Sequence, residues 1–377
     1  MKYIFFCPSY GFGGLEMQMV RRAQEAITRG DEALLVTAPD SKMLEYAGTL
    51  KVPAKTISIR LDYVDLFSAM RLGKIMKDEK IDSCIVGITR HLSIAIAAKK
   101  IFRLTNDIVL FQQMISGLKK IDFFHNWVYN NLDTAIVPTT LMADLLKKST
   151  VFPPAKIDII PYGVDIMEVD PSNYDVRTEK MRFGLPLDKR IIGQTARFEN
   201  LKDQETTIRA FATAALQDTI LVLAGDGDPT YRTKMQELTE TLGIQQNVKF
   251  LPFTLEFGAM LSCFDIYVMS SLCETFSLAL IQAMAAGKPV IGTRSGGTPE
   301  AIRHGQNGLL FEPRDKQTLA QYFKMLIQSQ ELRTDLGKQA KIDASSRYDR
   351  RVVNEKFFNA CVKSNNGAAN SMQLIPA

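Results

Sequence analysis

The chain has 377 residues, of which 46% are apolar and 23% charged, and its formal net charge is +5. This composition is typical of a globular protein and excludes disordered and fibrous chains, and no apolar run reaches the roughly 18 residues of a transmembrane helix. Five scattered cysteines without a C-x-x-C pair, and only three histidines, argue against a disulfide framework or a zinc site and fit a reducing cytoplasm. The length predicts two domains rather than one.

The first half of the chain predicts a parallel α/β domain. Residues 1–8 are basic and then apolar, and because they run straight into a glycine loop we interpret them as a buried strand rather than a signal peptide. A helical pattern follows over residues 15–29. Further strands are expected at residues 33–38, 83–88, 107–111 and 135–137, with helical patterns between them. This alternation indicates a parallel sheet flanked by helices.

The alternation breaks at residues 160–165, and the polar, turn-rich stretch that follows predicts an interdomain linker. It then restarts. Strands are expected at 190–196, 219–224, 247–251, 265–269 and 289–292, and helices at 203–216, 231–242, 277–286 and over much of 316–364. We therefore predict two doubly wound domains, residues 1–165 and 166–347, followed by a C-terminal helix and tail, residues 348–377. A ligand is expected in the cleft between the domains, at the carboxyl ends of the strands.

The loop after the first strand is rich in glycine. It includes Gly13 and Gly14 and opens the first helix, so its backbone can approach a ligand closely and the helix start favours an anion. The loop is not a G-x-G-x-x-G dinucleotide fingerprint. A tight strand-to-helix turn explains the glycines equally well.

The corresponding loop of the second domain offers two cations. Arg197 can bind phosphate with its forked guanidinium, and Lys202 adds a point charge at the carboxyl end of the same strand. The alternative is a pair of surface salt bridges.

The segment with the strongest functional pattern is residues 270–291. Glu274 comes just before a helix whose first amides, at Phe276, Ser277 and Leu278, can hold a phosphate or sugar oxygens. Glu274 can accept hydrogen bonds from sugar hydroxyls, or it can simply cap the helix. Gln282 is a polar residue in the otherwise apolar helix.

Together these segments resemble the retaining GT-B glycosyltransferases of family GT4. Glu274 matches the first acid of the family's E-x7-E signature, and Arg197 and Lys202 match its two phosphate-binding cations. The Gly13-Gly14 pair matches its N-terminal loop. Further matching phrases lie at residues 160–165, 225–227, 248–251, 264–270 and 296–302, so that the resemblance is dense from about 192 to 312 and thinner in the first domain.

The resemblance implies a GT-B fold, with two Rossmann-like domains facing across a cleft and a C-terminal helix returning to the N-terminal domain. The second domain would bind a nucleotide-activated sugar, and the resemblance to the family favours uridine as its base. The first domain would bind a glycan or lipid-linked acceptor. Arg197 and Lys202 would stabilise the departing diphosphate without a metal or other cofactor, and Glu274 would position the sugar. The setting implied is cell-surface polysaccharide assembly at the cytoplasmic face of the membrane, with no nucleic acid as partner.

The chain departs from the family pattern at two places. Gln282 replaces the second acid of E-x7-E, which family members use on the ribose; glutamine keeps the hydrogen bonds but not the charge. The family often has a histidine where this chain has Phe111-Gln112-Gln113-Met114. His91, after the preceding strand, is the nearby imidazole. We consider it either a catalytic residue that touches the donor sugar or acceptor, or an ordinary partly buried histidine.

Basic and aromatic residues gather in the sequence of the first domain. They are either solvated helix faces with buried aromatics or a face that docks on a membrane or an anionic acceptor. The residues are Lys99, Lys100, Phe102, Arg103, Lys119, Lys120, Phe123, Phe124 and Trp127.

Other functions remain open alongside an active transferase. Gln282 and the missing histidine also fit a nucleotide-sugar-binding partner protein with degraded catalysis. A nucleotide-sugar 2-epimerase or a glycogen phosphorylase would share the fold, although a phosphorylase would be longer and carry a pyridoxal-binding lysine segment. A dehydrogenase is disfavoured because neither domain begins with a dinucleotide fingerprint.

Overall fold

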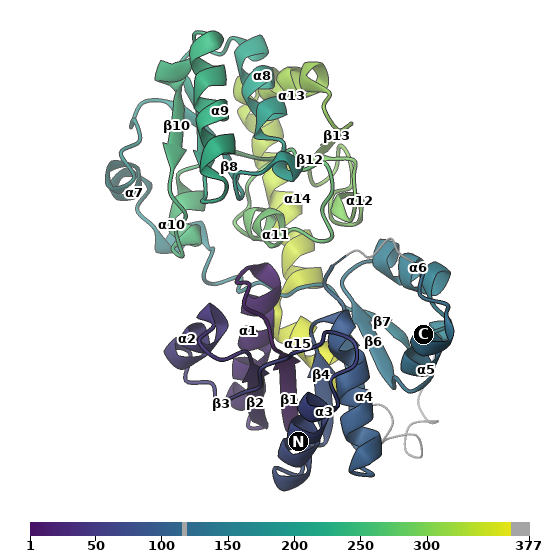
Figure 1. Ribbon diagram of the computed structural model, residues 1–377. Helices are drawn as coiled ribbons and strands as arrows, with labels where there is room; N and C mark the ends of the chain where they lie inside the picture. The colour runs from purple at the N-terminus through teal and green to yellow at the C-terminus, as the bar shows by residue number, and fades with distance from the viewer. Residues whose placement is uncertain (115–118, 363–377) are drawn as a thin grey trace, which may run out of the picture. The chain divides into compact units, whose positions relative to one another are not determined.

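The computed structural model describes residues 1–114 and 119–362. The chain divides into two compact units: Met1–Pro161 together with the chain from Asn354, and Tyr162–Val353. Each unit is built on one parallel sheet flanked by helices (Figure 1). The two parallel Rossmann-like sheets confirm the predicted fold class.

The N-terminal unit contains a seven-stranded sheet of order β3-β2-β1-β4-β5-β6-β7. One of its interior strands, β1, is apolar and buried along most of its length, and it pairs in parallel with β2 and β4, as expected of a strand covered on both faces. The strands are β1 (Lys2–Cys7), β2 (Glu32–Thr37), β3 (Ala54–Thr56), β4 (Ser83–Val86), β5 (Asp107–Phe111), β6 (Thr134–Val137) and β7 (Ile157–Ile159). The helices are α1 (Gly14–Thr28), α2 (Lys42–Thr49), α3 (Leu66–Asp78), α4 (Leu92–Ile101), α5 (Phe123–Asn130) and α6 (Thr140–Ser149).

The second unit contains a six-stranded sheet of order β10-β9-β8-β11-β12-β13. Its strands are β8 (Arg190–Thr195), β9 (Thr219–Ala224), β10 (Val248–Leu251), β11 (Ile266–Met269), β12 (Val290–Thr293) and β13 (Leu309–Phe311). Its helices are α7 (Val176–Arg182), α8 (Gln204–Ala214), α9 (Pro229–Thr241), α10 (Phe257–Ser262), α11 (Leu278–Ala285), α12 (Thr298–Ala301), α13 (Lys316–Gln328) and α14 (Gln330–Tyr348).

The last helix, α15 (Arg350–Ala360), returns the chain to the N-terminal unit. Phe358 lies against Tyr3 of β1, with ring centroids 5.3 Å apart, and Phe357 lies 5.0 Å from Phe111 of β5. Both phenylalanines are buried. The predicted return of the C-terminal helix is therefore confirmed, and its driving force is burial of aromatic surface.

The predicted strands and the first helix all form, with ends that shift by one or two residues. Three strands that the sequence did not predict are β3, β7 and β13, each of three residues and each at the edge of its sheet. Two short helical segments, at Pro171–Asn173 and Val176–Arg182, lie in the stretch expected to be a linker.

Candidate active site

The predicted cations and acid of the second unit lie at the point where its strand order reverses. β8 has β9 on one side and β11 on the other, so the loops that leave β8 and β11 splay apart at the carboxyl end of the sheet. This is where open α/β sheets bind ligands. Arg197 and Lys202 lie in the loop after β8, and Glu274 lies in the loop after β11.

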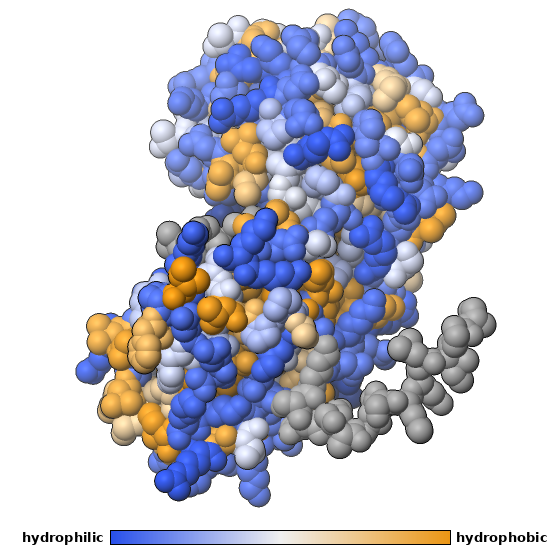
Figure 2. Space-filling view, turned by 90° about the vertical axis from the view of Figure 1, so that its right-hand side faces the viewer, coloured by the Kyte–Doolittle hydropathy of each residue, from blue (hydrophilic) through white to orange (hydrophobic). Residues whose placement is uncertain are grey.

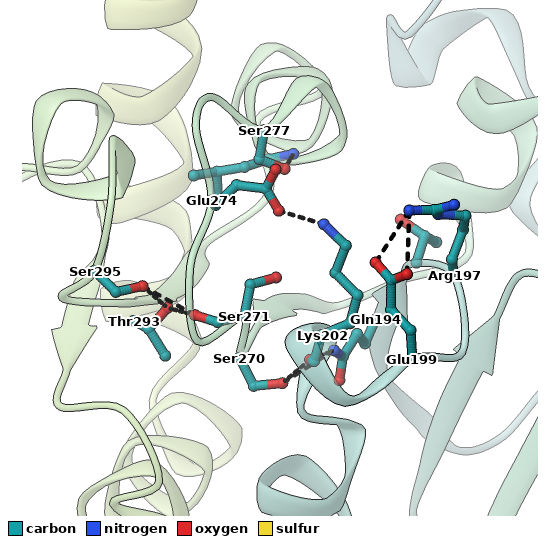
Figure 3. Close-up of polar contacts among 12 residues, drawn as sticks. Gln194, Arg197, Glu199, Lys202, Ser270, Ser271, Glu274, Ser277, Thr293 and Ser295 are labelled. Carbon is teal, nitrogen blue, oxygen red and sulfur yellow. Dashed lines mark hydrogen bonds and ion pairs between the residues drawn. The ribbon is translucent and has the colours of Figure 1, made fainter. Parts of the chain in front are cut away.

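Lys202 and Glu274 form an ion pair across these two loops. The Lys202 Nζ lies 2.6 Å from a Glu274 carboxylate oxygen, and the side chains are 20% and 17% exposed (Figure 3). Glu274 is therefore not the cap of helix α11: that position belongs to Ser277, whose hydroxyl accepts a hydrogen bond from the Leu280 amide. The pair brings together two residues that the sequence assigned to the diphosphate and to the sugar.

The backbone at Lys202 is fixed by a buried hydrogen-bond network. The Gln194 amide nitrogen donates to the Lys202 carbonyl at 3.1 Å and to the Ser270 hydroxyl at 3.0 Å. The Ser270 hydroxyl is also directed at the Lys202 and Asp203 carbonyls. The Leu272 amide donates to the Leu201 carbonyl, which joins the two loops directly. Because these groups are buried, the network restricts where the Lys202 ammonium can lie.

The backbone at Glu274 is held by the chain after β12. Gly296 has a φ of +55°, and a Cβ at this position would come within 2.0 Å of the Glu274 carbonyl oxygen, so only glycine fits. The Gly297 amide donates to the same carbonyl at 2.8 Å. Nearby, the hydroxyls of Thr293 and Ser295 both donate to the Ser271 carbonyl (Figure 3). The acid-bearing loop is thus fixed by residues distant in sequence.

Arg197 is more exposed than Lys202 and points elsewhere. Its side chain is 70% exposed, and its guanidinium pairs with Glu199, 3.1 Å away, rather than with Glu274 (Figure 3). Its backbone is nonetheless fixed, because Gly225 and Gly227 pack directly on the 196–198 segment and both have positive φ. An exposed ion pair of this kind contributes little stability, so the guanidinium is free to exchange Glu199 for a ligand phosphate.

The start of helix α11 combines a packed side chain with unengaged amides. The Phe276 ring is buried between Tyr162 and Tyr348, each 5.5 Å away. Among the described residues, the backbone amides of Phe276 and Ser277 donate to no acceptor. Leu278 is the first helical residue, and Gln282 lies one turn later on the same face, half-buried. The donor-binding roles of these four residues stay predictions.

The N-terminal unit places its predicted residues at its own reversal point, between β1 and β4. Gly13 precedes helix α1, and its amide donates to the Glu16 carboxylate at 3.0 Å, while the Ser9 hydroxyl donates to the other oxygen. An anion arriving at Gly13 would have to displace Glu16. A Cβ on Gly14 would meet nothing within 4 Å, so the space beside Gly14 is open.

His91 ends the short 3-10 turn (Thr89–His91) after β4 and is 1% exposed. Burial lowers its pKa to about 4, and its Nε2 lies 3.4 Å from Asp62. Its Nδ1 has no hydrogen-bond partner among the described residues. The ring lies 6.1 Å from that of Phe6. These surroundings favour the packing alternative, and the catalytic role stays a prediction.

Taken together, the second unit offers two cations, unengaged helix-start amides and a carboxylate around one loop cluster. The cations and amides suit a diphosphate, and the carboxylate suits sugar hydroxyls. Within the described residues, no group of three or more His, Cys, Asp or Glu side chains could hold a metal ion.

Three positioning residues escaped the sequence reasoning: Gln194, Ser270 and Gly296. Gln194 carried a signal, because it is a polar residue in the middle of a buried strand. Ser270 follows such a strand directly. Gly296 lies in a segment that resembles the family, residues 296–302, but its contact with Glu274 depends on tertiary structure.

Known proteins match both units. A family model described as glycosyl transferases group 1 matches residues 175–343, and one described as glycosyltransferase family 4 matches residues 12–168. The N-acetyl-alpha-D-glucosaminyl L-malate synthase of Bacillus anthracis is 34% identical over 168 residues, 44% of each chain. The lipopolysaccharide core biosynthesis glycosyltransferase LpsE of Rhizobium meliloti is 27% identical over 48% of this chain and 53% of its own.

Among solved structures, Anabaena HepE in complex with UDP superposes with a TM-score of 0.83 at 21% identity, covering 95% of this chain and 99% of that chain. It has also been solved with UDP-glucose. This likeness shows the fold. The aligned part of the chain spans about half the length of the two curated relatives.

Proposed function

Because the chain belongs to the group 1 glycosyltransferases of family 4, we propose that it moves a sugar from a nucleoside diphosphate to a hydroxyl of a glycan or lipid-linked acceptor, with retention of configuration. The donor favoured is a UDP-sugar, because the structural relative HepE binds UDP and UDP-glucose. The reaction needs no metal or other cofactor.

The observation that carries this proposal is the Lys202–Glu274 pair at the reversal point of the second sheet. A partly buried ammonium that touches a partly buried carboxylate costs desolvation, which a surface pair would avoid. The arrangement is useful when a ligand supplies partners for both groups. A diphosphate takes the ammonium and the sugar hydroxyls take the carboxylate.

In this account Lys202 and Arg197 stabilise the charge that grows on the departing diphosphate, in the role that a metal ion has elsewhere. The unengaged amides of Phe276 and Ser277 add donors for the same oxygens. Leu278 and Gln282 lie on the helix face that follows, and Gln282 binds the ribose as a neutral donor and acceptor. In the N-terminal unit, we assign Gly13 and Gly14 to donor binding and His91 to catalysis.

The acceptor is assigned to the domain predicted over residues 1–165, and the donor to the domain predicted over residues 166–347. The N-terminal unit exposes several large apolar side chains, including Leu61, Phe67 and Phe123, beside basic residues. Such a surface suits peripheral contact with the inner face of a membrane.

Among the described residues, no helix is both long and apolar enough to cross a membrane. Cell-surface polysaccharide assembly is the setting we propose, in the cytoplasm, and LpsE is named for that kind of pathway.

The test is sugar transfer from a panel of nucleotide-sugars in the presence of a chelator. Arg197→Ala and Glu274→Ala should each lower the transfer rate by orders of magnitude, since they remove charge stabilisation of the leaving group and positioning of the sugar. Rates near that of the wild type in both variants would refute these roles.

A second candidate is a nucleotide-sugar-binding partner protein with degraded catalysis, which Gln282 favours because it lacks the charge of the usual acid. Gln282→Glu discriminates between the two. A large gain in turnover would support the degraded site, and an unchanged or lower rate would support an active enzyme adapted to glutamine.

A further inference from the structure

The N-terminal unit contains a pocket that the donor chemistry does not use. It lies where the 3-10 turn after β4 and the start of α4 meet helix α5 and the loop before α3. Its empty space, including solvent at its mouth, is about 270 Å³. The polar residues that line it are Tyr63, Thr89, Arg90, Ser93, Lys120 and His125.

The lining of this pocket is positively charged. It includes Arg90 and Lys120, and no acidic side chain contributes to it. The Arg90 guanidinium forms a long ion pair with Asp62, in which its Nε lies 3.4 Å from Oδ1. Lys120 is half-buried and forms no ion pair with the described residues, whereas Lys99 of α4 pairs with Asp133 at 2.9 Å. Burial lowers the pKa of the Lys120 ammonium.

A half-buried ammonium without a counter-ion is unfavourable unless something else supplies the charge. An anionic ligand would do so and would form charge-assisted hydrogen bonds to it. Other lining residues are held in place by contacts within the unit. His125 is fixed by Asp122, which its Nδ1 contacts, and its ring packs edge-on against Tyr63 and Phe124. The Ser93 hydroxyl donates to the Tyr63 carbonyl at 2.6 Å, which fixes the loop before α3.

We propose that this pocket binds a phosphate or carboxylate group carried by the acceptor, with Lys120 and Arg90 as its principal cations. The inference rests on the proposed function, because it assigns the acceptor a chemical class. It does not concern the nucleotide, whose phosphates are assigned to Arg197 and Lys202 in the other unit. The enzyme would thus bind an anionic group of the acceptor at a different place from the diphosphate of the donor.

The surface beside the pocket is apolar. Phe123, next to the lining residue Phe124, is 90% exposed, and Leu61 and Val64, in the same loop as Tyr63, are also exposed. Figure 2 shows hydrophobic side chains gathered on the N-terminal unit, towards the lower left of the view. The anionic group therefore has two possible sources, a lipid headgroup and a soluble phosphate, which present the same chemistry to Lys120.

The test compares Lys120→Gln with Lys119→Gln, which removes the same charge from the neighbouring, exposed residue. sn-Glycerol 3-phosphate is titrated into the full chain by calorimetry, with UDP present in excess to occupy the donor site. The lipid source is probed by sedimentation with phosphatidylcholine vesicles, with and without phosphatidylglycerol. UDP affinity and the midpoint of thermal unfolding are measured for each variant.

Lys120→Gln should weaken binding of glycerol phosphate, of phosphatidylglycerol vesicles, or of both, about tenfold or more, because a charge-assisted contact is lost. Lys119→Gln should change binding little, and both variants should bind UDP like the wild type. Loss in the calorimetric arm alone identifies a soluble phosphate, and loss in the vesicle arm identifies a lipid headgroup.

Equal effects of the two substitutions would overturn the proposal, because they would indicate general surface charge. Absence of any anion binding in a wild-type chain that binds UDP would overturn it as well. A chain that binds no UDP would instead count against the proposed function. The comparison of Lys120→Gln with Lys119→Gln would still decide the pocket, and Arg90→Gln provides a second variant should Lys120→Gln fail to fold.

Discussion

At the scale of single residues, the candidate site is built around a lysine and a glutamate that form an ion pair. Lys202 and Glu274 lie 72 residues apart in sequence and 2.6 Å apart in space. In the proposed function, donor binding exchanges this contact for contacts to the diphosphate and to the sugar. The two residues should therefore respond differently to UDP, which carries the phosphates without the sugar.

Glu274→Ala should leave UDP affinity equal to that of the wild type or higher, while transfer falls by orders of magnitude. The substitution frees the Lys202 ammonium for the diphosphate and removes a nearby negative charge, but it also removes the acceptor for the sugar hydroxyls. Calorimetric titration with UDP measures the first effect and a transfer assay the second. A large loss of UDP affinity in this variant would mean that Glu274 binds the nucleotide and not the sugar.

His91 predicts a pH dependence of stability. Its folded pKa of about 4 lies below its ordinary value of 6.5, so the unfolded chain binds the proton first. The stabilisation from keeping this ring neutral is present above pH 6.5 and is lost as the pH falls through 4, with a magnitude on the order of 3 kcal/mol. The unfolding midpoint of His91→Gln should fall less between pH 7 and pH 4 than that of the wild type. Parallel curves for the two proteins over this interval would contradict the assignment.

The sequence predicts the charged residues of the candidate site but not how they pair. Arg197, Lys202 and Glu274 could be predicted because each sits at a strand end or beside a helix start, which local patterns reveal. That Lys202 pairs with Glu274, and Arg197 with Glu199, follows from side-chain directions across loops, which no local pattern encodes. The same holds for the cap of α11, which is Ser277 and not Glu274.

At the scale of elements, the acid-bearing loop after β11 is positioned by the turn after β12. Gly296 makes this possible, since its positive φ and missing side chain let the turn touch the Glu274 backbone. Gly305 also has a positive φ, of +75°, but a Cβ there would meet nothing within 4 Å. An alanine at Gly305 therefore carries only the conformational cost of a positive φ. An alanine at Gly296 carries that cost and a steric clash as well.

Gly305→Ala should lower the free energy of unfolding by about 1–2 kcal/mol, the cost of a left-handed conformation for alanine, and should leave transfer unchanged. Gly296→Ala should cost more and should also lower transfer strongly, because the Glu274 backbone has to move. Chemical denaturation and a transfer assay on both variants measure this. Similar activity in the two would show that the Glu274 loop tolerates displacement.

The long buried strands could be predicted from the sequence, and the short edge strands could not. β8 and β9 are six-residue runs that are buried almost throughout. β3 and β7 have only three residues each, with the exposed positions expected at a sheet edge, so neither length nor alternation distinguishes them from a loop. β13 is apolar, but its three residues are too few to indicate a period.

At the scale of the whole molecule, the chain ends by completing the unit with which it begins. Phe357 is buried against Phe111, and the Arg22 guanidinium lies 4.6 Å above its ring. The seven-stranded sheet thus depends on aromatic residues of the last helix, α15. The periodicity of the tail could predict a helix, whereas its destination came only from the family resemblance.

Phe357→Ala should lower the free energy of unfolding by about 3–5 kcal/mol, because it leaves a cavity in the aromatic cluster. Val352→Ala, on an exposed position of the same helix, should change it by less than about 0.5 kcal/mol. Thermal unfolding of the two variants makes the comparison. A small effect of Phe357→Ala would show that the N-terminal unit does not need the C-terminal helix.

The central claim is that the second unit binds a nucleoside diphosphate through Lys202 without a metal. The most direct measurement is thermal unfolding of the wild type and Lys202→Gln against a panel of nucleoside diphosphates, in a chelator and then in magnesium. We predict that UDP stabilises the wild type in the chelator, by about 2.7 kcal/mol at a hundredfold excess over its dissociation constant, and stabilises Lys202→Gln much less. Stabilisation that requires magnesium, or that is equal in the two proteins, would contradict the account.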